Sequence, residues 1–343
     1  MVTKLKDLAA QLGLSQTTVS RALNGFPEVS EITRQRVAEA ALRLGYRANA
    51  NARRLATGRA GAIGIALPLQ RSQHFGPHMS EFLSGIGERL AQFELDIVVA
   101  PLAEDDEVPV FRRLAQSHRV DAVVISAPVP QDRRIAELTE LGLPFVLHGR
   151  TDVDIAHAWL DIDNEAAFHR ATSHLIDLGH RRIAMINGPV EQTFAQHRDR
   201  GFRRALAERG ILADPLLMGG GRFSDESGFR LAQAFLEQRP APTAFIAGSM
   251  MTALGVFRAI RSAGLVLGRD VSMIAHDDVF PYLNADNMVP TMSTTRSSIR
   301  AAGARIAELL MQILAGKDPG TVQELWPVEL VLRESTGPVV VKG

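Results

Sequence analysis

The sequence predicts a small all-α N-terminal headpiece followed by an α/β core of two doubly wound parallel-sheet subdomains. Within the first 45 residues, three short amphipathic helical patterns occur and no strand pattern. After residue 61, short β-rich apolar runs alternate with helical stretches of about 10 to 15 residues, an order typical of parallel sheets covered by helices. The remaining chain of roughly 280 residues is too long for one modest sheet, so two similar halves are expected.

Composition excludes several classes of protein. The 343 residues are 46% hydrophobic and include no cysteine, so disulfide scaffolds, thiolate metal sites and cysteine nucleophiles are excluded. Apolar runs such as Ala62–Leu69 and Val120–Val129 are far shorter than the roughly 18 to 20 residues that span a bilayer. The N-terminus lacks the apolar segment of a secretory signal. We therefore expect a cytoplasmic chain without membrane partner, metal or cofactor.

Charge is divided unevenly along the chain. Residues 1–60 contain ten Lys and Arg against four Asp and Glu, a net charge of +6, and the rest of the chain carries −6. A basic N-terminal part on an acidic body favours a polyanionic partner at one end, because each phosphate neutralised adds to binding. A solvated basic face is the alternative.

Three helices are predicted in the headpiece from apolar residues at helical spacing and from capping residues. The second helix would bury Val19 and Leu23 and leave polar side chains outside. The expected boundaries, from cap to end, are Thr3 to Gly13, Ser15 to Asn24 and Ser30 to Gly45.

Two short helices joined by a tight glycine-containing turn and braced by a third are typical of a helix-turn-helix unit. Glutamine can pair with adenine, arginine with guanine, and threonine with either class of base, so the exposed residues of the second helix are expected to read a major groove. An ordinary three-helix cap is the alternative. The candidate base-reading residues are Gln16, Thr17, Ser20 and Arg21.

Residues 47–60 read as a linker with only a thin apolar stripe, too weak for an isolated helix in water. Arg53, Arg54 and Arg59 make DNA a plausible agent to order this segment, which would couple its folding to binding.

In the core, the apolar runs and amphipathic stretches predict alternating strands and helices. Because ligands bind at the carboxyl ends of strands in open α/β sheets, two halves joined near Asp161–Asn164 are expected to enclose a binding cleft. The expected strands are Ile63–Leu67, Asp96–Ala100, Ala122–Ser126, Phe145–His148, Ile183–Asn187, Ala244–Ala247 and Ser272–Ala275. The expected helices include Met79–Phe93, Gln131–Leu141, Glu165–Leu178, Gln196–Arg209, Ser227–Gln238 and Met251–Ala263.

Motifs along nearly the whole chain resemble the lactose/galactose repressor family. In the headpiece and linker they are TKLKDLAAQLGLSQTTVSRALNG and VSEITRQRVAEAALRLGYRANANARRLATGRAGAIGIALP, and in the core they include VDAVVIS, HLIDLGHRRIAMINGP, RDRGFRRAL and HDDVFPYL. The resemblance implies a core like a periplasmic sugar-binding protein. It also implies a repressor whose affinity for a pseudo-palindromic operator is controlled by a small molecule, expected to be a sugar or glycoside.

The resemblance also assigns DNA contacts. It implies major-groove contacts for Gln16, Thr17 and Arg21 and phosphate contacts for Thr3, Asn24 and Tyr46. Leu55 matches a leucine that wedges between base pairs in the minor groove, as apolar wedges of other minor-groove proteins do.

Effector contacts follow from the same resemblance. Arg198 matches an arginine that grips ligand hydroxyls or a carboxylate, with a surface arginine as the alternative. Asp277 matches a carboxylate that accepts from ligand hydroxyls, with a loop cap as the alternative. Ser249 stands where many sugar-binding members have asparagine. The further expected contacts are Phe223 and Phe75, each equally compatible with a core position, and His74, Gln192 and Phe194.

The expected domain boundaries combine these observations. A helix-turn-helix headpiece spans residues 1–46 and a hinge spans 47–60. The N-subdomain comprises residues 61–161 and 291–321, and the C-subdomain comprises 162–290 and 322–343.

Two other classes of function, an enzyme and a solute-binding protein, fit the sequence less well. An enzyme is disfavoured because the chain has no GxSxG, HExxH or GxxxxGK[ST] motif. A solute-binding protein without DNA function fits the cleft but not the basic headpiece. The C-terminal tail carries no leucine heptads, so a homodimer is expected. A non-sugar metabolite as effector, and induction or co-repression as its effect, stay open.

Overall fold

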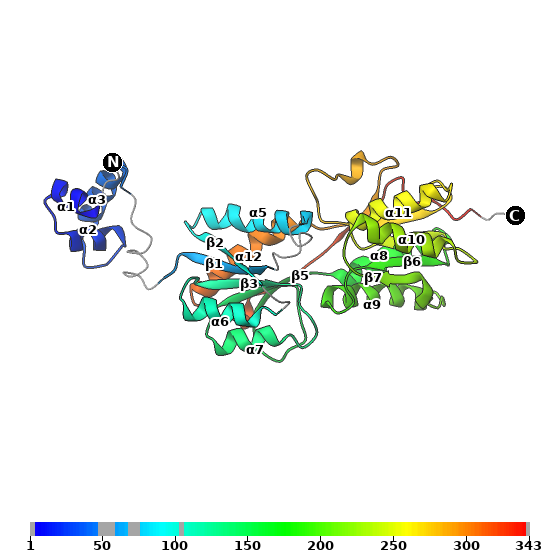
Figure 1. Ribbon diagram of the computed structural model, residues 1–343, viewed down its shortest axis with the longest axis horizontal. Coiled ribbons are helices and arrows are strands. Elements are labelled where there is room, and N and C mark those ends of the chain that lie inside the picture. Colours follow the sequence, from blue (N-terminus) through cyan, green and yellow to red (C-terminus); the bar gives the residue numbers. More distant parts are fainter. Residues whose placement is uncertain (1–3, 47–58, 68–75, 103–105, 341–343) are drawn as a thin grey trace.

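The structure is a computed structural model that describes residues 4–46, 59–67, 76–102 and 106–340. A helical headpiece is followed by two α/β subdomains arranged along the long axis of the molecule (Figure 1). No helix within these ranges is both long and apolar enough to cross a membrane.

The headpiece contains the three predicted helices α1 (Leu5–Leu12), α2 (Gln16–Leu23) and α3 (Glu31–Arg43). The predicted stops are confirmed, because Gly13 and Gly45 have φ of 65° and 60°, the left-handed region that favours glycine. The N-caps Ser15 and Ser30 are also confirmed, since each hydroxyl accepts a backbone N–H of its helix. The expected cap Thr3 is wrong: Lys4 holds that position, and its N–H donates to Asp7.

Each subdomain is built on a six-stranded sheet with helices on both faces. The strands of the first sheet, in spatial order, are β11 (Gln323–Trp326), β5 (Ala158–Ile162), β4 (Phe145–His148), β3 (Ala122–Ser126), β1 (Ala62–Leu67) and β2 (Asp96–Pro101). The second has β12 (Glu329–Val331), β10 (Ser293–Arg296), β9 (Ser272–Asp277), β8 (Ala244–Ala247), β6 (Ile183–Asn187) and β7 (Met218–Gly220). The first sheet is entirely parallel, whereas β12 runs antiparallel to β10 at the edge of the second.

The helices form two layers on each sheet. Those of the first subdomain are α5 (Pro77–Ala91), α6 (Val108–Gln116), α7 (Arg133–Glu140) and α12 (Ile299–Leu314). Those of the second are α8 (Asn164–Asp177), α9 (Thr193–Ala207), α10 (Asp225–Leu236) and α11 (Met250–Ser262).

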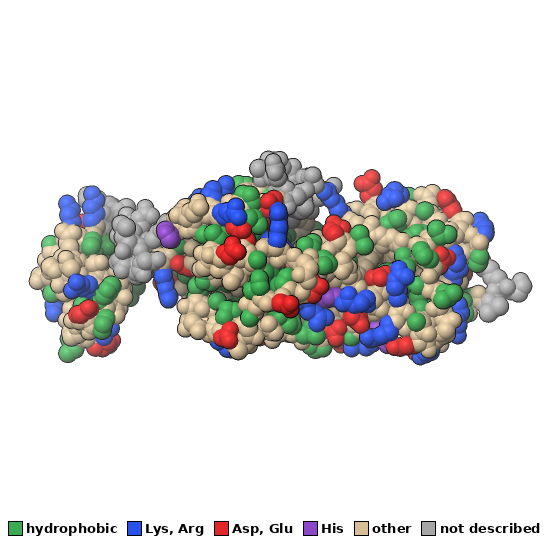
Figure 2. All heavy atoms as spheres, turned by 90° about the horizontal axis from the view of Figure 1, so that it is seen from below, with side chains coloured by type: hydrophobic (Ala, Val, Ile, Leu, Met, Phe, Trp, Pro, Cys, Tyr) green, Lys and Arg blue, Asp and Glu red, His purple; other side chains and the backbone are tan. Residues whose placement is uncertain are grey.

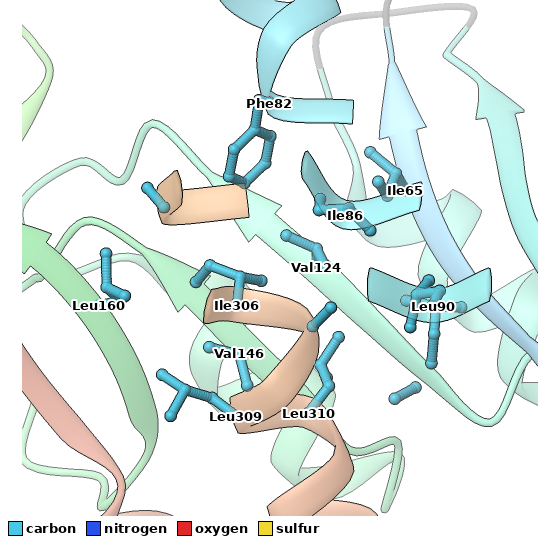
Figure 3. Packing of buried hydrophobic residues seen from close by; sticks show 14 of the residues in the cluster. Ile65, Phe82, Ile86, Leu90, Val124, Val146, Leu160, Ile306, Leu309 and Leu310 are labelled. Atoms are coloured by element: carbon cyan, nitrogen blue, oxygen red, sulfur yellow. The ribbon is translucent and has the colours of Figure 1, made fainter. Parts of the chain in front are cut away.

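Alternation along the strands divides the first subdomain into two cores. Val124 points to the face covered by α5 and α12, while Val123 and Ile125 point to the face covered by α6 and α7. Figure 3 shows Ile86 of α5 and Ile306 of α12 among the side chains gathered against Val124. The burial of both faces explains why the strands read as continuous apolar runs.

The second and third crossings between the subdomains correct the expected domain boundaries. Residues 291–321 were expected in the N-subdomain, and α12 does pack there, but β10 before it pairs with β9 in the second sheet. Residues 322–343 were expected in the C-subdomain, and β12 does pair there, but β11 before it pairs with β5 in the first sheet. The chain therefore crosses after Arg296 and after Trp326. Both strands have only four residues, so their sequence pattern does not specify which sheet they join.

Glycine permits close packing of α5 on α12. A Cβ on Gly85 would collide with the backbone carbonyl of Arg300, and a Cβ on Gly303 would collide with that of Phe82. Gly87, on the same helix, would place its Cβ 3.6 Å from Ile97, an ordinary contact.

We expect substitution by alanine to have opposite effects on stability at Gly85 and at Gly87. Gly85→Ala must push α12 away and should lower the free energy of unfolding by about 2 to 4 kcal/mol, as other overpacked cores do. Gly87→Ala has room and should raise it by up to about 1 kcal/mol through helix propensity. Thermal unfolding of both variants measures this, and equal effects would contradict the packing described.

Candidate functional site

Helix α2 presents the predicted base-reading side chains to solvent. Val19 and Ala22 are buried against the headpiece core, which leaves Gln16, Thr17 and Arg21 exposed on the opposite side. Ser20 is half-buried at the margin of this surface. Figure 2 shows Lys and Arg side chains on the headpiece surface. This combination of hydrogen-bonding side chains and positive charge suits a DNA groove.

The predicted phosphate contacts are less uniform. Asn24 ends α2, and its Nδ2 donates to the carbonyl of Ser20. Tyr46 packs against the headpiece core, and burial raises the pKa of its hydroxyl. Five predicted site residues lie outside the described ranges: Thr3, Arg53 and Leu55 for DNA, and His74 and Phe75 for the effector.

A cavity of about 800 Å³ lies between the two subdomains. It is lined by the carboxyl ends of β1 and β3 in the first sheet and by the segments after β6 and β7 in the second. The strand order changes direction between β1 and β3 in the first sheet and between β6 and β8 in the second. Open α/β sheets bind ligands at the carboxyl ends of the strands at such a point. The lining residues are Ala66, Leu67, Met79, Leu102, Glu107, Ser126, Ala127, Pro189, Val190, Glu191, Gln192, Gly220, Gly221 and Arg222.

A backbone hydrogen bond crosses the cleft beside this cavity. The N–H of Thr193, at the start of α9, donates to the carbonyl of Pro128 at 2.9 Å. The loop that carries Pro128 has two non-glycine residues with positive φ, Ala127 at 51° and Gln131 at 50°. Such conformations are costly and are held by their surroundings, as here by the bonds from Gln131 to Asp152.

Arg198 lies at the carboxyl edge of the second sheet with 4% of its surface exposed. Its Nε donates to Asn164 Oδ1 at 2.7 Å and its Nη1 to the carbonyl of Gly248 at 2.8 Å. The rings of Phe168 and Phe194 each lie 4.9 Å from its guanidinium carbon. Burial lowers its pKa to about 10, so it stays charged at neutral pH. Among the described residues, Nε and Nη1 are the two guanidinium nitrogens of Arg198 that donate hydrogen bonds.

Several other predicted effector residues gather around Arg198. Phe194 and Phe223 lie with ring centroids 6.0 Å apart, next to Gly188 and Gly248. Ser249 follows Gly248 and caps α11 by accepting the N–H of Thr252. Gln192 instead lines the cavity between the subdomains.

Asp277 ends β9 at the same edge of the sheet. It is buried, its Oδ1 accepts the N–H of Val279, and its Oδ2 lies 3.9 Å from Nε of Arg296. Burial raises the pKa of this carboxyl. The residue therefore caps the following loop through Oδ1, while Oδ2 faces Arg296.

Sequence reasoning missed a second charged group at the junction. Asp278 lies between His276, at 3.5 Å, and His78 of the first subdomain, at 3.8 Å. Burial alone would raise the pKa of Asp278, but the interactions with His276, His78 and Arg198 lower it to about 2. His148 stacks on Phe82, and burial lowers its pKa to about 3. The motif HDDVFPYL contains His276 and Asp278, but nothing in the sequence connects it with His78 on α5 or His148 on β4.

Asn164, Asp161 and Glu107 were also missed. Asn164 and Asp161 flank the first crossing, where the only signal was the predicted boundary itself. Glu107 lines the cavity and pairs with the buried Arg134 at 2.9 Å. Within the described residues no group of three or more His, Asp or Glu side chains is placed to hold a metal ion.

Comparisons with known proteins agree with both parts of this arrangement. Residues 4–49 match the model of bacterial regulatory proteins of the lacI family. Residues 61–330 match the model of periplasmic binding proteins and the sugar-binding domain of the LacI family. The HTH-type transcriptional regulator AglR of Rhizobium meliloti (strain 1021) is 48% identical over 339 residues, 98% of this chain and 95% of that protein.

Solved structures are similar along nearly the full length. The lac repressor dimer bound to operator and the anti-inducer ONPF has a TM-score of 0.81 at 27% identity, covering 98% of this chain and 100% of that one. A complex of the transcriptional regulator CelR with cellobiose has a TM-score of 0.71 at 28% identity, covering 97% and 99%.

Proposed function

Because the chain belongs to the LacI family of bacterial regulatory proteins, we propose that this transcriptional regulator represses its target genes and is controlled by a neutral saccharide bound between its subdomains. A cavity lined by both subdomains carries this proposal, because a ligand there touches both and can favour one of their orientations over another.

The chemistry around the cavity supports a neutral polyhydroxyl ligand. Glu107, Glu191 and Arg222 line the cavity, and Glu107 is paired with Arg134, so the lining carries no excess of positive charge that would attract an anionic effector. Arg198 and Asp277 do not line the cavity itself, but we infer that a ligand which extends from it to the carboxyl edge of the second sheet meets Nη2 of Arg198 as a donor and Oδ2 of Asp277 as an acceptor. The rings of Phe194 and Phe223 offer apolar faces of the kind on which sugar rings stack. The size of the cavity suits a ligand of this class.

The DNA-binding half of the proposal follows from the headpiece. Gln16, Thr17, Ser20 and Arg21 contact base edges in a major groove, and Thr3, Asn24 and Tyr46 contact phosphates. Arg53 and Leu55 act in the linker, where Leu55 wedges into the minor groove. The lac repressor binds operator as a dimer, and we extend that assembly and a pseudo-palindromic site to this chain. The chain acts in the cytoplasm, where the DNA is, and binds its ligand without turning it over.

A thermal-shift screen tests the effector class. The full chain is heated with maltose, cellobiose, raffinose, cytidine or citrate. A saccharide at about 100 times its Kd adds about 2.7 kcal/mol, which raises Tm by about 4 °C for a chain of this size. A rise with cytidine or citrate and with no saccharide would contradict the proposal in favour of a non-sugar metabolite.

A gel-shift assay tests the regulator's response. Operator sites are selected from random duplexes, and the binding sugar is then titrated into the complex. We expect the operator affinity to change, and the direction of the change distinguishes an inducer from a co-repressor. Binding that ignores a sugar which stabilises the protein would exclude effector control.

A further inference from the structure

A cluster of three charged or titratable side chains lies at the first crossing between the subdomains. Asp161, near the end of β5, is 4% exposed. Its Oδ2 lies 3.1 Å from Nε of Arg150, in the first subdomain, and 3.8 Å from Nδ1 of His197, on α9 of the second. The carboxylate is thus shared across the junction.

This cluster is incompletely satisfied. Arg150 Nε, Asp161 Oδ2 and His197 Nδ1 are all buried, and none of the three has a hydrogen-bond partner with acceptable geometry. Buried polar atoms without partners are uncommon and costly. Of the two contacts only that with His197 joins the two subdomains, so a rotation that brings α9 closer to β5 would shorten it and satisfy Asp161 better.

The same carboxylate is connected to Arg198 through one residue. Its Oδ1 accepts the backbone N–H of Ile162 at 2.8 Å and lies 3.4 Å from Nδ2 of Asn164. The amide of Asn164 is thereby oriented with its Oδ1 toward Arg198. A ligand that shifts the guanidinium of Arg198 would therefore also shift the Asn164 amide and change its contact with Asp161.

Charged groups from several elements act on this cluster. Asp161 faces Arg150 from the segment after β4 and His197 and Arg198 from α9. His197 in turn faces Arg150, Arg200 on α9, and Asp163 and Glu165 at the start of α8. Burial raises the pKa of Asp161 to about 6, against the attraction of Arg150. Burial and the nearby Arg150 and Arg200 lower the pKa of His197 to about 4. Between pH 7.5 and 5 it is therefore Asp161 that changes charge in this cluster.

We propose that Asp161 is a positioning residue that couples the effector-binding Arg198 to the relative orientation of the two subdomains. The coupling to an effector rests on the function proposed for Arg198, whereas the control of orientation by Asp161 does not. Both can be measured without any effector.

Distance measurements between the subdomains test the control of orientation. The chain has no cysteine, so Glu140→Cys on α7 and Ala207→Cys on α9, both at exposed positions, accept two spin labels. Labelled full-length protein is mixed with excess unlabelled protein so that distances within one subunit dominate, and double electron–electron resonance is recorded at pH 7.5 and 5.0.

We expect the distance distribution to shift between the two pH values. Asp161→Asn mimics the protonated carboxyl, so this variant at pH 7.5 should resemble the unmodified chain at pH 5.0 and lose most of the shift. His78→Gln removes the other pair across the junction, with Asp278, and should retain the shift. If Asp161→Asn leaves the distribution and its pH response unchanged, Asp161 does not set the orientation.

A double-mutant cycle tests the coupling to Arg198. We expect the change in Tm of Asp161→Asn with Arg198→Ala to differ from the sum of the single changes, because residues in one network are not additive. Arg198→Lys replaces Arg198→Ala if the latter does not fold. Asp214→Asn, whose carboxylate pairs with Arg182 within the second subdomain, is the matched control and should be additive. Additive changes for Asp161 would overturn the coupling.

These outcomes separate the inference from the proposed function. Failure of every saccharide to bind, with the pH shift and the non-additivity present, rejects the effector class and leaves the inference standing. If a saccharide binds but Asp161→Asn changes neither the distance distribution nor its pH response, the effector class stands and the inference about Asp161 is rejected.

Discussion

Replacing Arg198 with alanine is expected to weaken saccharide binding by about 100-fold or more while operator binding persists. The guanidinium is buried, charged and held by Asn164, Gly248 and two aromatic rings, so its remaining donor is fixed in place before a ligand arrives. A hydrogen bond to a charged group contributes about 1.5 to 3 kcal/mol, and burial from water places this one at the upper end.

Calorimetric titration with the sugar found in the thermal-shift screen measures this loss, and a gel shift measures operator affinity. Arg200→Ala is the matched control, because that exposed arginine lies on the same helix and pairs with Glu165. Arg198→Ala should also lower stability by about 2 to 3 kcal/mol, since it leaves acceptors on Asn164 and Gly248 unpaired. Normal sugar affinity in Arg198→Ala would remove this residue from the site.

The second large effect is expected in the headpiece. Arg21→Ala should reduce specific operator affinity by about 10- to 100-fold, because a bidentate contact to a base is worth about 1 to 3 kcal/mol of discrimination. Affinity for random DNA should fall much less, since that binding depends on total charge. Titrations of both duplexes at one salt concentration give the two losses.

Arg36→Ala provides the control, as Arg36 is an exposed arginine of the same headpiece on α3 instead of α2. Its removal costs the same charge and should change specific and non-specific binding by similar factors. Equal losses on both duplexes for Arg21→Ala would exclude base reading by this residue.

Local signals in the sequence predicted much of the fold. Gly13 and Gly45 end helices and Ser15 and Ser30 begin them, because each acts through the backbone of its own turn. Buried strands such as β1, β3 and β9 were recognised as apolar runs for a similar reason: both faces of each strand are covered.

The short strands next to the last two crossings, and the shared sites, were not predicted in the same way. The residues of β10 and β11 have no continuous apolar run, and the sheet that each joins is decided by its pairing with a strand distant in sequence. Arg198 was identified by resemblance, but its partners Asn164, Phe168 and Gly248 come from α8 and from the end of β8. Five predicted site residues, Leu55 among them, lie outside the described ranges and stay predictions.

The order of amino acids by itself determined the division into a basic headpiece and a two-part α/β core, the headpiece helix boundaries other than the start of α1, and the side chains that α2 exposes. These depend on caps, periodicity and charge within a few neighbouring residues. Only the tertiary structure decided that Asp161 meets Arg150 and His197, that Asp278 lies between two histidines, and where the chain makes its last two crossings. Those outcomes depend on contacts between residues distant in sequence, whose cost or gain exists only once both subdomains are packed.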